Sequence, residues 1–272
     1  MSPSRPVYFP VKAEPLRMQP GLFRFGTDFG NGDLDRQFLP RDEQHAHYTA
    51  EKRRILADHP RRVLVAAVSE EDHAALEAAR CFLVQTAENE GHPVRSELSL
   101  AQLGAELAED FAVLTRADRA VMVHVCFPSG WRPEAVVGES FVRIHRHVPA
   151  FGAIAERAHG LLEAMLTRGP YVRFVWTVTA DDQLDHHPEQ GARLPWTAQT
   201  AHGFLRVERQ TTVPLAGGTA SLFLIRTYLY PFAELSESQR AILSEALRQM
   251  PAELAAYKQL TSAVPRALQL LR

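Results

Sequence analysis

A chain of 272 residues is long enough to bury a sizeable core and is at the upper end of what one domain usually holds. Its 46% hydrophobic and 23% charged residues are typical of a globular protein, which excludes wholesale disorder and low-complexity classes. Lys and Arg number 30 against 32 Asp and Glu, so the net charge of -2 gives no long-range attraction for polyanions. We therefore expect no nucleic-acid partner.

The N-terminus lacks the apolar core of a secretory signal, and no run approaches the ~18 apolar residues of a membrane-spanning helix. Cys81 and Cys126 lie in apolar runs that predict burial as small hydrophobic side chains, as in a reducing compartment. The short basic clusters 52–54 and 61–62 are interpreted as solvated ends of elements. Together these features predict a cytoplasmic protein that does not enter a membrane.

Residues 1–40 contain many prolines and glycines with interspersed aromatic residues, which predicts an ordered arm packed on the body without long regular elements. Helix formers over 42–58 predict a helix, and the apolar run 62–68 predicts a strand. A serine N-cap and three acidic residues predict a helix over 70–90. Apolar residues at roughly helical spacing predict another helix over 99–114.

The second half is rich in β-branched and aromatic residues, which predicts four or five strands. These strands are expected over 120–127, 171–179, 205–213 and 219–230, the last two forming a hairpin around 214–218, with helices over 150–167, 236–249 and 251–260. Alternation places Val172 and Trp176 on a core face, and Arg173 on a polar face. The expected fold is a single α+β domain over 1–272, with an antiparallel sheet, helices on one side, the arm at 1–40 and C-terminal helices at 235–272.

The sequence lacks Gly-x-Gly-x-x-Gly, Walker, His-Glu-x-x-His and Gly-x-Ser-x-Gly motifs. Two separated cysteines cannot ligate an iron-sulfur cluster, so electrons for a redox reaction would come from another chain. The closest histidine groupings are His145 with His147, and His186 with His187. Each supplies two ligands, whereas a mononuclear zinc or iron site needs at least three. His186 and His187 are interpreted as residues of a solvated loop.

Residues 127–149 read FPSGWRPEAVVGESFVRIHRHVP. This block resembles the signature of the haem-dependent oxidative N-demethylase family, which has Pro-Ser-Gly-Trp, then Gly-x-x-Phe, then Ile-His-x-Pro-Val-Pro. Later segments are also similar to the family's Arg-x-Asn-Trp strand, Arg-x-Glu-Arg-Gln-Thr hairpin and Ile-Arg-Thr; they are residues 173–176, 206–211 and 225–227. Residues 17–22 extend the likeness to nearly the whole chain. Two positions depart from the pattern: His147 replaces a proline and Val175 replaces an asparagine.

The resemblance implies a PAS-like sheet that holds haem b, and an oxidative N-demethylation that converts a small secondary amine, similar to dimethylamine, and dioxygen to formaldehyde and a primary amine. It also implies a flavin reductase and an iron-sulfur ferredoxin as separate partner chains. His145 is expected to be the axial iron ligand, with His147 as its competitor. Cations for the haem propionates are expected among five arginines: Arg143, Arg173, Arg206, Arg209 and Arg226.

Glu208 is expected to bind the protonated amine, with Trp131 and Trp176 as wall residues. Structural alternatives stay open: an ion pair between Arg206 or Arg209 and Glu208, and tryptophans that belong to the core. Three hypotheses of function follow. The chain is a haem monooxygenase subunit, a non-catalytic module that binds haem or another small ligand, or a family descendant without haem.

Overall fold

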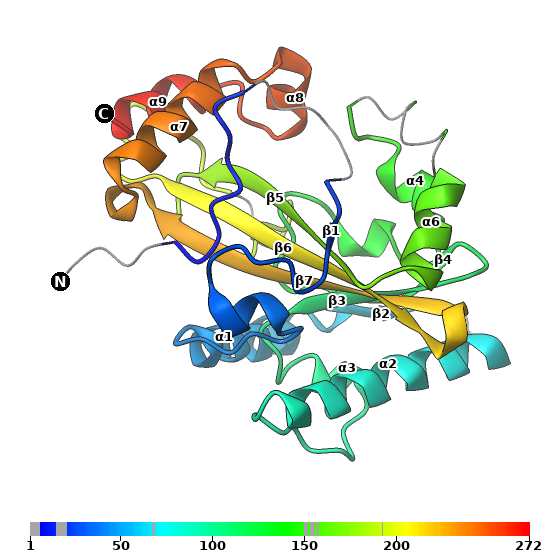
Figure 1. Ribbon diagram of the computed structural model, residues 1–272. Helices are drawn as coiled ribbons and strands as arrows, with labels where there is room; N and C mark the ends of the chain where they lie inside the picture. The colour runs from blue at the N-terminus through cyan, green and yellow to red at the C-terminus, as the bar shows by residue number, and fades with distance from the viewer. Residues whose placement is uncertain are drawn as a thin grey trace.

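The structure, a computed structural model, describes residues 6–14, 21–66, 69–149, 152, 156, 158–191 and 193–272. Within these residues one antiparallel sheet of seven strands, in the order β1-β5-β6-β7-β3-β4-β2, forms the centre of the protein (Figure 1). The strands are β1 (Phe23–Arg24), β2 (Val63–Val65), β3 (Asp110–Thr115), β4 (Arg119–His124), β5 (Tyr171–Thr179), β6 (Phe204–Leu215) and β7 (Ala220–Pro231). The expected α+β class is confirmed, whereas the PAS-like character stays a prediction.

Eight α-helices in the described part of the chain flank this sheet. They are α1 (His45–Asp58), α2 (Glu70–Asn89), α3 (Leu100–Leu103), α4 (Phe141–His145), α6 (Ala158–Thr167), α7 (Glu237–Arg248), α8 (Ala252–Tyr257) and α9 (Val264–Leu270). Ser69 is the N-cap of α2, as the sequence predicted. It forms a capping box, since its side chain accepts from the backbone N–H of Asp72 and the Asp72 carboxylate accepts from the backbone N–H of Ser69.

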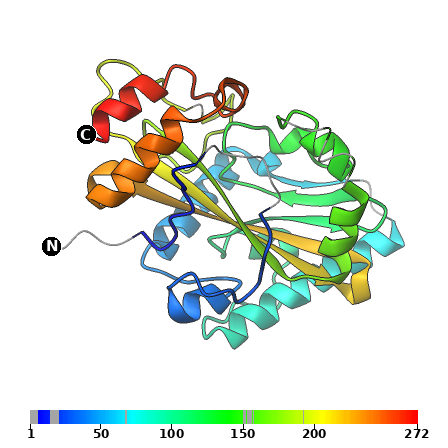
Figure 2. The same cartoon turned by 45° about the horizontal axis from the view of Figure 1, so that its top comes forward.

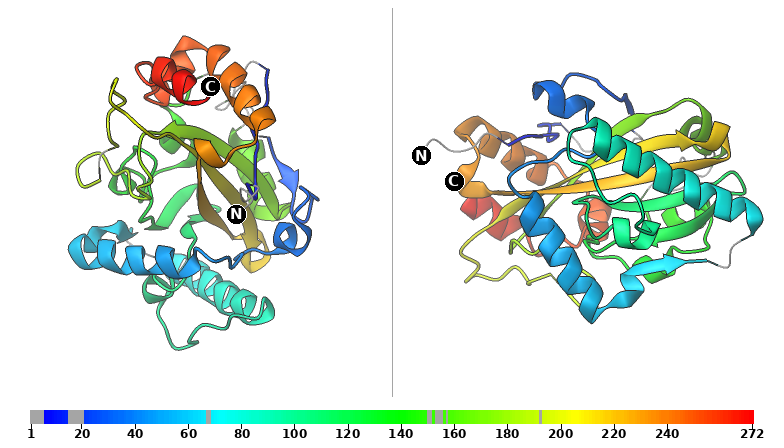
Figure 3. Two further views of the ribbon diagram at one scale, coloured as in Figure 1. Left: turned by 90° about the vertical axis from the view of Figure 1, so that its left-hand side faces the viewer. Right: turned by 90° about the horizontal axis from the view of Figure 1, so that it is seen from below.

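The helices cover both faces of the sheet, so the expectation of helices on one side is wrong. Helices α2 and α3 pack on one face, against an apolar cluster that includes Phe111 and Leu222. On the opposite face, α4 and α6 pack against Ala112 and Val123 (Figures 1 and 3). Helices α7, α8 and α9 form a separate group at the far end of β5, β6 and β7 (Figure 2).

Strands β5, β6 and β7 lie close to their predicted positions, since β6 and β7 form the expected hairpin and β5 pairs with β6 along its whole length. The N-terminal arm packs on the Val172 face of these strands where the structure describes it. There the Tyr8 ring lies 4.8 Å from Phe174 and edge-on to Tyr228. The expectation for residues 1–5 and 15–20 lies outside the described residues.

Residues 99–114 do not form the expected helix. Helix α3 ends at Leu103, and Asp110–Thr115 form β3, which pairs with both β7 and β4. The spacing of apolar residues wrongly predicted a helix here, because β3 is buried on both faces and therefore lacks the alternation of apolar and polar residues that indicates a strand. The expected helix over 150–167 is observed as α6 from Ala158, and residues 150, 151, 153–155 and 157 lie outside the described residues.

Three expectations about exposure are wrong. Lys52 and Arg62, interpreted as solvated, are fully buried because each has a carboxylate partner, Asp110 at 3.1 Å and Asp185 at 2.7 Å. Cys81 is exposed on α2 beside Arg80, whereas Cys126 is buried as predicted. Among the helices that the structure describes, none has the length and apolar character to cross a membrane.

Candidate functional site

A charged sheet face lies on the same side as α4 and α6. The register of β5 and β6 places Arg173 opposite Gln210, Val175 opposite Glu208 and Thr177 opposite Arg206. Alternation along both strands directs these side chains to the face opposite the one covered by the N-terminal arm. The prediction that Arg173 lies on a polar face is confirmed.

His145 is the last residue of the short helix α4, and its side chain is half-buried. Its Nδ1 lies 2.8 Å from the carbonyl oxygen of Phe141. Because a carbonyl only accepts, Nδ1 carries the proton and Nε2 carries the lone pair. Within the described residues Nε2 makes no hydrogen bond. Burial lowers the pKa of His145, and the positive charge of Arg173 lowers it further, so the imidazole is neutral near pH 7.

The other two predicted site residues of this segment, His147 and Arg143, are exposed to solvent. His147 is exposed, and its Nε2 accepts a hydrogen bond from Arg146 Nε at 2.9 Å. Arg143 is exposed and forms an ion pair with Glu139 at 2.9 Å. The site geometry therefore favours His145 over His147 as a ligand, because His145 is half-buried and oriented by a backbone carbonyl, whereas His147 is exposed.

Arg173 projects from the charged face of the sheet. Burial lowers its pKa, and the nearby Glu208 carboxylate and the Tyr257 hydroxyl oppose that shift. No hydrogen bond or ion pair of Arg173 is present in the described part of the chain. A desolvated cation of this kind is available for an anionic ligand.

Glu208 is largely buried and already has two protein partners. Gln210 Nε2 donates to its Oε2 at 3.0 Å, and Arg206 Nε lies 3.6 Å from its Oε1. The ion pair between Arg206 and Glu208, one of the two structural alternatives from the sequence, is therefore observed. Arg206 also donates to the carbonyl oxygens of Leu184 and Phe127 at 2.9 and 2.7 Å, so it joins two loops to the sheet.

Two predicted site residues lie on the opposite face of the sheet. Arg209 donates to the carbonyl oxygen of Gln37, and its guanidinium lies over the rings of Tyr8 and Phe25. Trp176 is 5% exposed and belongs to the core that packs against the C-terminal helices. Both side chains are held by the N-terminal arm or the core, as their alternation along the strands required.

Arg226 is likewise on the arm face, where Nη2 binds both carboxylate oxygens of Asp42 at 2.7 and 2.8 Å. Trp131, in contrast, lies on the side of α4. It is half-buried in the apolar cluster of Phe141 and Ile144. The structure thus places His145, Arg173, Arg206, Glu208 and Trp131 on one side of the sheet, and Arg209, Arg226 and Trp176 on the other.

Three residues near Glu208 were not expected from the sequence: Arg193, Tyr257 and Lys258. Lys258 donates from Nζ to the carbonyl oxygen of Trp176 at 2.6 Å, and burial lowers its pKa to about 8 against the opposing effect of Glu208. Arg193 donates to the Lys258 carbonyl at 3.2 Å, and burial lowers its pKa to about 10. The sequence carried no signal for them, since a single lysine at a helix end and an arginine in a loop are usually solvated.

The interpretation of His186 and His187 as solvated is wrong, because both are buried. His186 Nε2 donates to Asp181 Oδ1 at 2.7 Å, and His187 Nε2 donates to Glu134 Oε2 at 3.1 Å. The backbone of His186 also exchanges hydrogen bonds with Pro128 and Gly130. This loop therefore fixes the segment that leads to Trp131.

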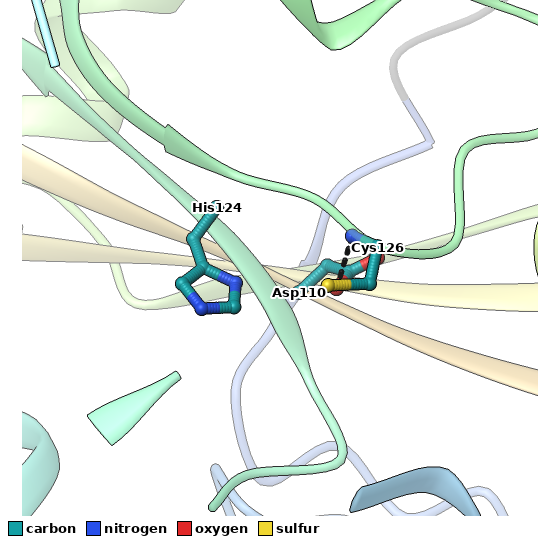
Figure 4. A group of neighbouring side chains, drawn as sticks. All are labelled: Asp110, His124 and Cys126. Carbon is teal, nitrogen blue, oxygen red and sulfur yellow. Dashed lines mark hydrogen bonds between the residues drawn. The ribbon is translucent and has the colours of Figure 1, made fainter. Parts of the chain in front are cut away.

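A second group of possible ligands consists of Asp110, His124 and Cys126, whose ligand atoms all lie within 4.8 Å of one another (Figure 4). The Asp110 carboxylate already accepts from the backbone N–H groups of Cys126 and Phe127 at 3.0 and 2.8 Å. Lys52 Nζ lies 3.1 Å from its Oδ1. The buried ammonium thus supplies the positive charge that balances the carboxylate, and we interpret the group as structural.

These observations define an α+β protein in which a charged sheet face lies on the same side as a neutral, half-buried histidine. Residues 80–268 match a family model described as haem-dependent oxidative N-demethylase, alpha subunit-like. Because the match covers more than half of the chain, the chain belongs to this family. The family description is that of a haem-dependent oxidative enzyme. A comparison with curated proteins finds no match.

Proposed function

We propose that this chain is a haem-binding subunit that demethylates a small secondary amine, similar to dimethylamine, to formaldehyde and a primary amine. The observation that carries the proposal is the state of His145: Nδ1 donates to the Phe141 carbonyl, and Nε2 has a free lone pair in the described structure. A neutral imidazole oriented through its other nitrogen is what an axial haem ligand requires.

The neighbouring residues fit haem b in chemical type. Phe141, Ile144 and Trp131 form an apolar wall beside His145. Arg173 supplies a cation that has no hydrogen bond or ion pair among the described residues, and Arg143, which pairs with Glu139, supplies a second one at the solvent side of α4. Haem bound there would supply the activation of dioxygen, while the protein holds the iron through His145 and the propionates through these arginines.

For the amine, Glu208 is the candidate binding group, because a secondary amine is protonated near pH 7 and a largely buried carboxylate favours that charge. Gln210 and Arg206 fix the carboxylate, so it orients the ammonium without moving. Electrons are proposed to come from a flavin reductase and an iron-sulfur ferredoxin as separate chains. The two cysteines support this division, since one is exposed and the other buried in a different part of the fold.

One observation favours an alternative, a protein that binds haem or another small ligand without turnover. Glu208 already has Arg206 and Gln210 as partners, so its carboxylate can be satisfied without substrate. Formaldehyde production from an added amine, dioxygen and a reductant separates the two functions.

The deciding experiment is the visible absorption spectrum of the protein expressed with haem precursor. We expect a Soret band in the unmodified protein and in a His147→Ala variant, and its loss or a clear shift in a His145→Ala variant. The His147→Ala variant is the matched control because that imidazole is exposed two residues away. Absence of the band from the unmodified protein after haem titration would refute the proposal. Loss of the band only in His147→Ala would refute the assignment of His145.

A further inference from the structure

The charges around Glu208 do not balance. Arg206 Nε lies 3.6 Å from Glu208, and Arg193 and Lys258 also interact with its charge. Asp181 is a second carboxylate, which interacts with Arg193. Asp181 is committed to protein donors, since it accepts from His186 at 2.7 Å and from the backbone N–H of Leu194 at 2.9 Å. Three cations therefore face two carboxylates, without counting Arg173.

Several buried donors in this region have hydrogens to spare. Of the three hydrogens on Lys258 Nζ, one donates to the Trp176 carbonyl within the described structure. Arg193 Nε and the Thr177 hydroxyl are buried without a hydrogen-bond partner among the described residues. Buried donors without partners are rare, because each costs the free energy of its lost hydration. Their concentration beside a surplus of positive charge indicates a place for an anionic acceptor.

From this we infer that the amine accepted at this site is zwitterionic: an N-methyl amino acid whose ammonium binds Glu208 and whose carboxylate binds Lys258, assisted by Arg193. The inference rests on the proposed function and narrows its substrate class. A simple alkylammonium ion would add one more positive charge to a region that already has an excess. A zwitterion adds no net charge and gives the spare donors an acceptor.

The reaction balances for the smallest member of this class. N-Methylglycine, one dioxygen, two protons and two electrons give glycine, formaldehyde and one water. One oxygen atom enters the N-methyl C–H bond, and the hydroxylated methyl group then leaves as formaldehyde when its C–N bond breaks. The other oxygen atom is reduced to water, and the electrons come from the reduced partner chain named above.

Calorimetric titration of the full-length protein with two ligands of the same skeleton tests the inference without turnover. The two ligands differ at one group, which is a carboxylate in N-methylglycine and a methyl group in N-ethylmethylamine. We expect N-methylglycine to bind at least roughly tenfold more tightly, since a charge-assisted hydrogen bond to a buried cation contributes about 10- to 100-fold in affinity. Equal or weaker binding of N-methylglycine would overturn the inference.

Substitution then assigns the effect to Lys258. Lys258→Gln should lose at least roughly tenfold in affinity for N-methylglycine and less than about threefold for N-ethylmethylamine, whereas Lys258→Arg should retain part of the preference. Arg248→Gln is the matched control, because Arg248 is exposed and pairs with Glu245 at the end of α7. A Lys258→Gln variant that loses haem while keeping the ligand preference would assign Lys258 to a propionate and overturn the inference.

The two proposals fail in different ways. Absence of a Soret band would refute the haem enzyme, and the ligand preference would still be measured by calorimetry. A Soret band and formaldehyde release from N-ethylmethylamine, without preference for N-methylglycine, would support the enzyme and overturn the zwitterionic substrate.

Discussion

A Lys52→Met variant tests the buried ion pair between α1 and the sheet. Lys52 is fully buried, and its Nζ lies 3.1 Å from Asp110 Oδ1 while donating to the carbonyl oxygens of Gly104 and Glu109. Methionine fills the space of the aliphatic stem but removes the charge and all three donors. The carboxylate of Asp110 then stays buried without a counter-charge, which costs about 3–5 kcal/mol of folding free energy. At about 2–4 °C per kcal/mol, Tm should fall by roughly 6–20 °C.

Urea unfolding followed by circular dichroism measures this loss, and Arg53→Met is the control from the adjacent position. Arg53 pairs with Glu106 at 2.7 Å, but its side chain is 51% exposed, so its loss should cost less than about 1 kcal/mol. If Lys52→Met changed the free energy of unfolding by as little as the control does, the Asp110 carboxylate would not depend on the ammonium. The structural interpretation of the Asp110, His124 and Cys126 group would then be wrong.

Three further outcomes are expected. Gly104→Ala places a Cβ against the His124 ring and should destabilise the fold by about 1–3 kcal/mol, with His124→Ala restoring part of the loss. Additive effects of the two changes would contradict the close contact. Burial lowers the pKa of His124 to about 3, against about 6.5 when unfolded, so the unfolded chain binds the proton first and stability should fall as pH drops from about 6.5 toward 3. The urea midpoint should depend less steeply on pH in a His124→Asn variant. An unchanged pH dependence would contradict the lowered pKa of His124. Arg206→Gln leaves the Phe127 and Leu184 carbonyls without their donor and should lower stability by about 3–5 kcal/mol in the same urea assay, whereas a change below about 1 kcal/mol would show that the network is dispensable.

The strands of the second half could be predicted because they are rich in β-branched and aromatic residues. Val172 and Trp176 face the core while Arg173 faces the site, and the sequence pattern states this directly. The strand at 110–115 could not be predicted in the same way. It is covered on both faces, so its side chains are nearly all buried and its spacing resembles that of a helix.

The site was predicted in part, and its errors have a common cause. Arg206 and Glu208 lie on one face of the sheet and Arg209 on the other, as alternation along one strand requires. Local sequence does not report tertiary partners, however. Lys52 was interpreted as solvated because its partner Asp110 is distant in the sequence. His186 was interpreted as solvated because nothing in the local sequence marks Asp181, five residues earlier, as its partner.

The N-terminal arm and α1 lie before the span matched by the family model, yet they stabilise charged residues inside that span. The match to the family model begins at residue 80. Three buried charged residues within the matched span have their partners before residue 80. Asp110 depends on Lys52 from α1, while Arg226 depends on Asp42 and Arg209 on the Gln37 carbonyl. An excised fragment of 80–268 would leave these charges stranded in an apolar interior. The smallest fragment of this protein that folds on its own is therefore larger than residues 80–268, the span that the family model matches.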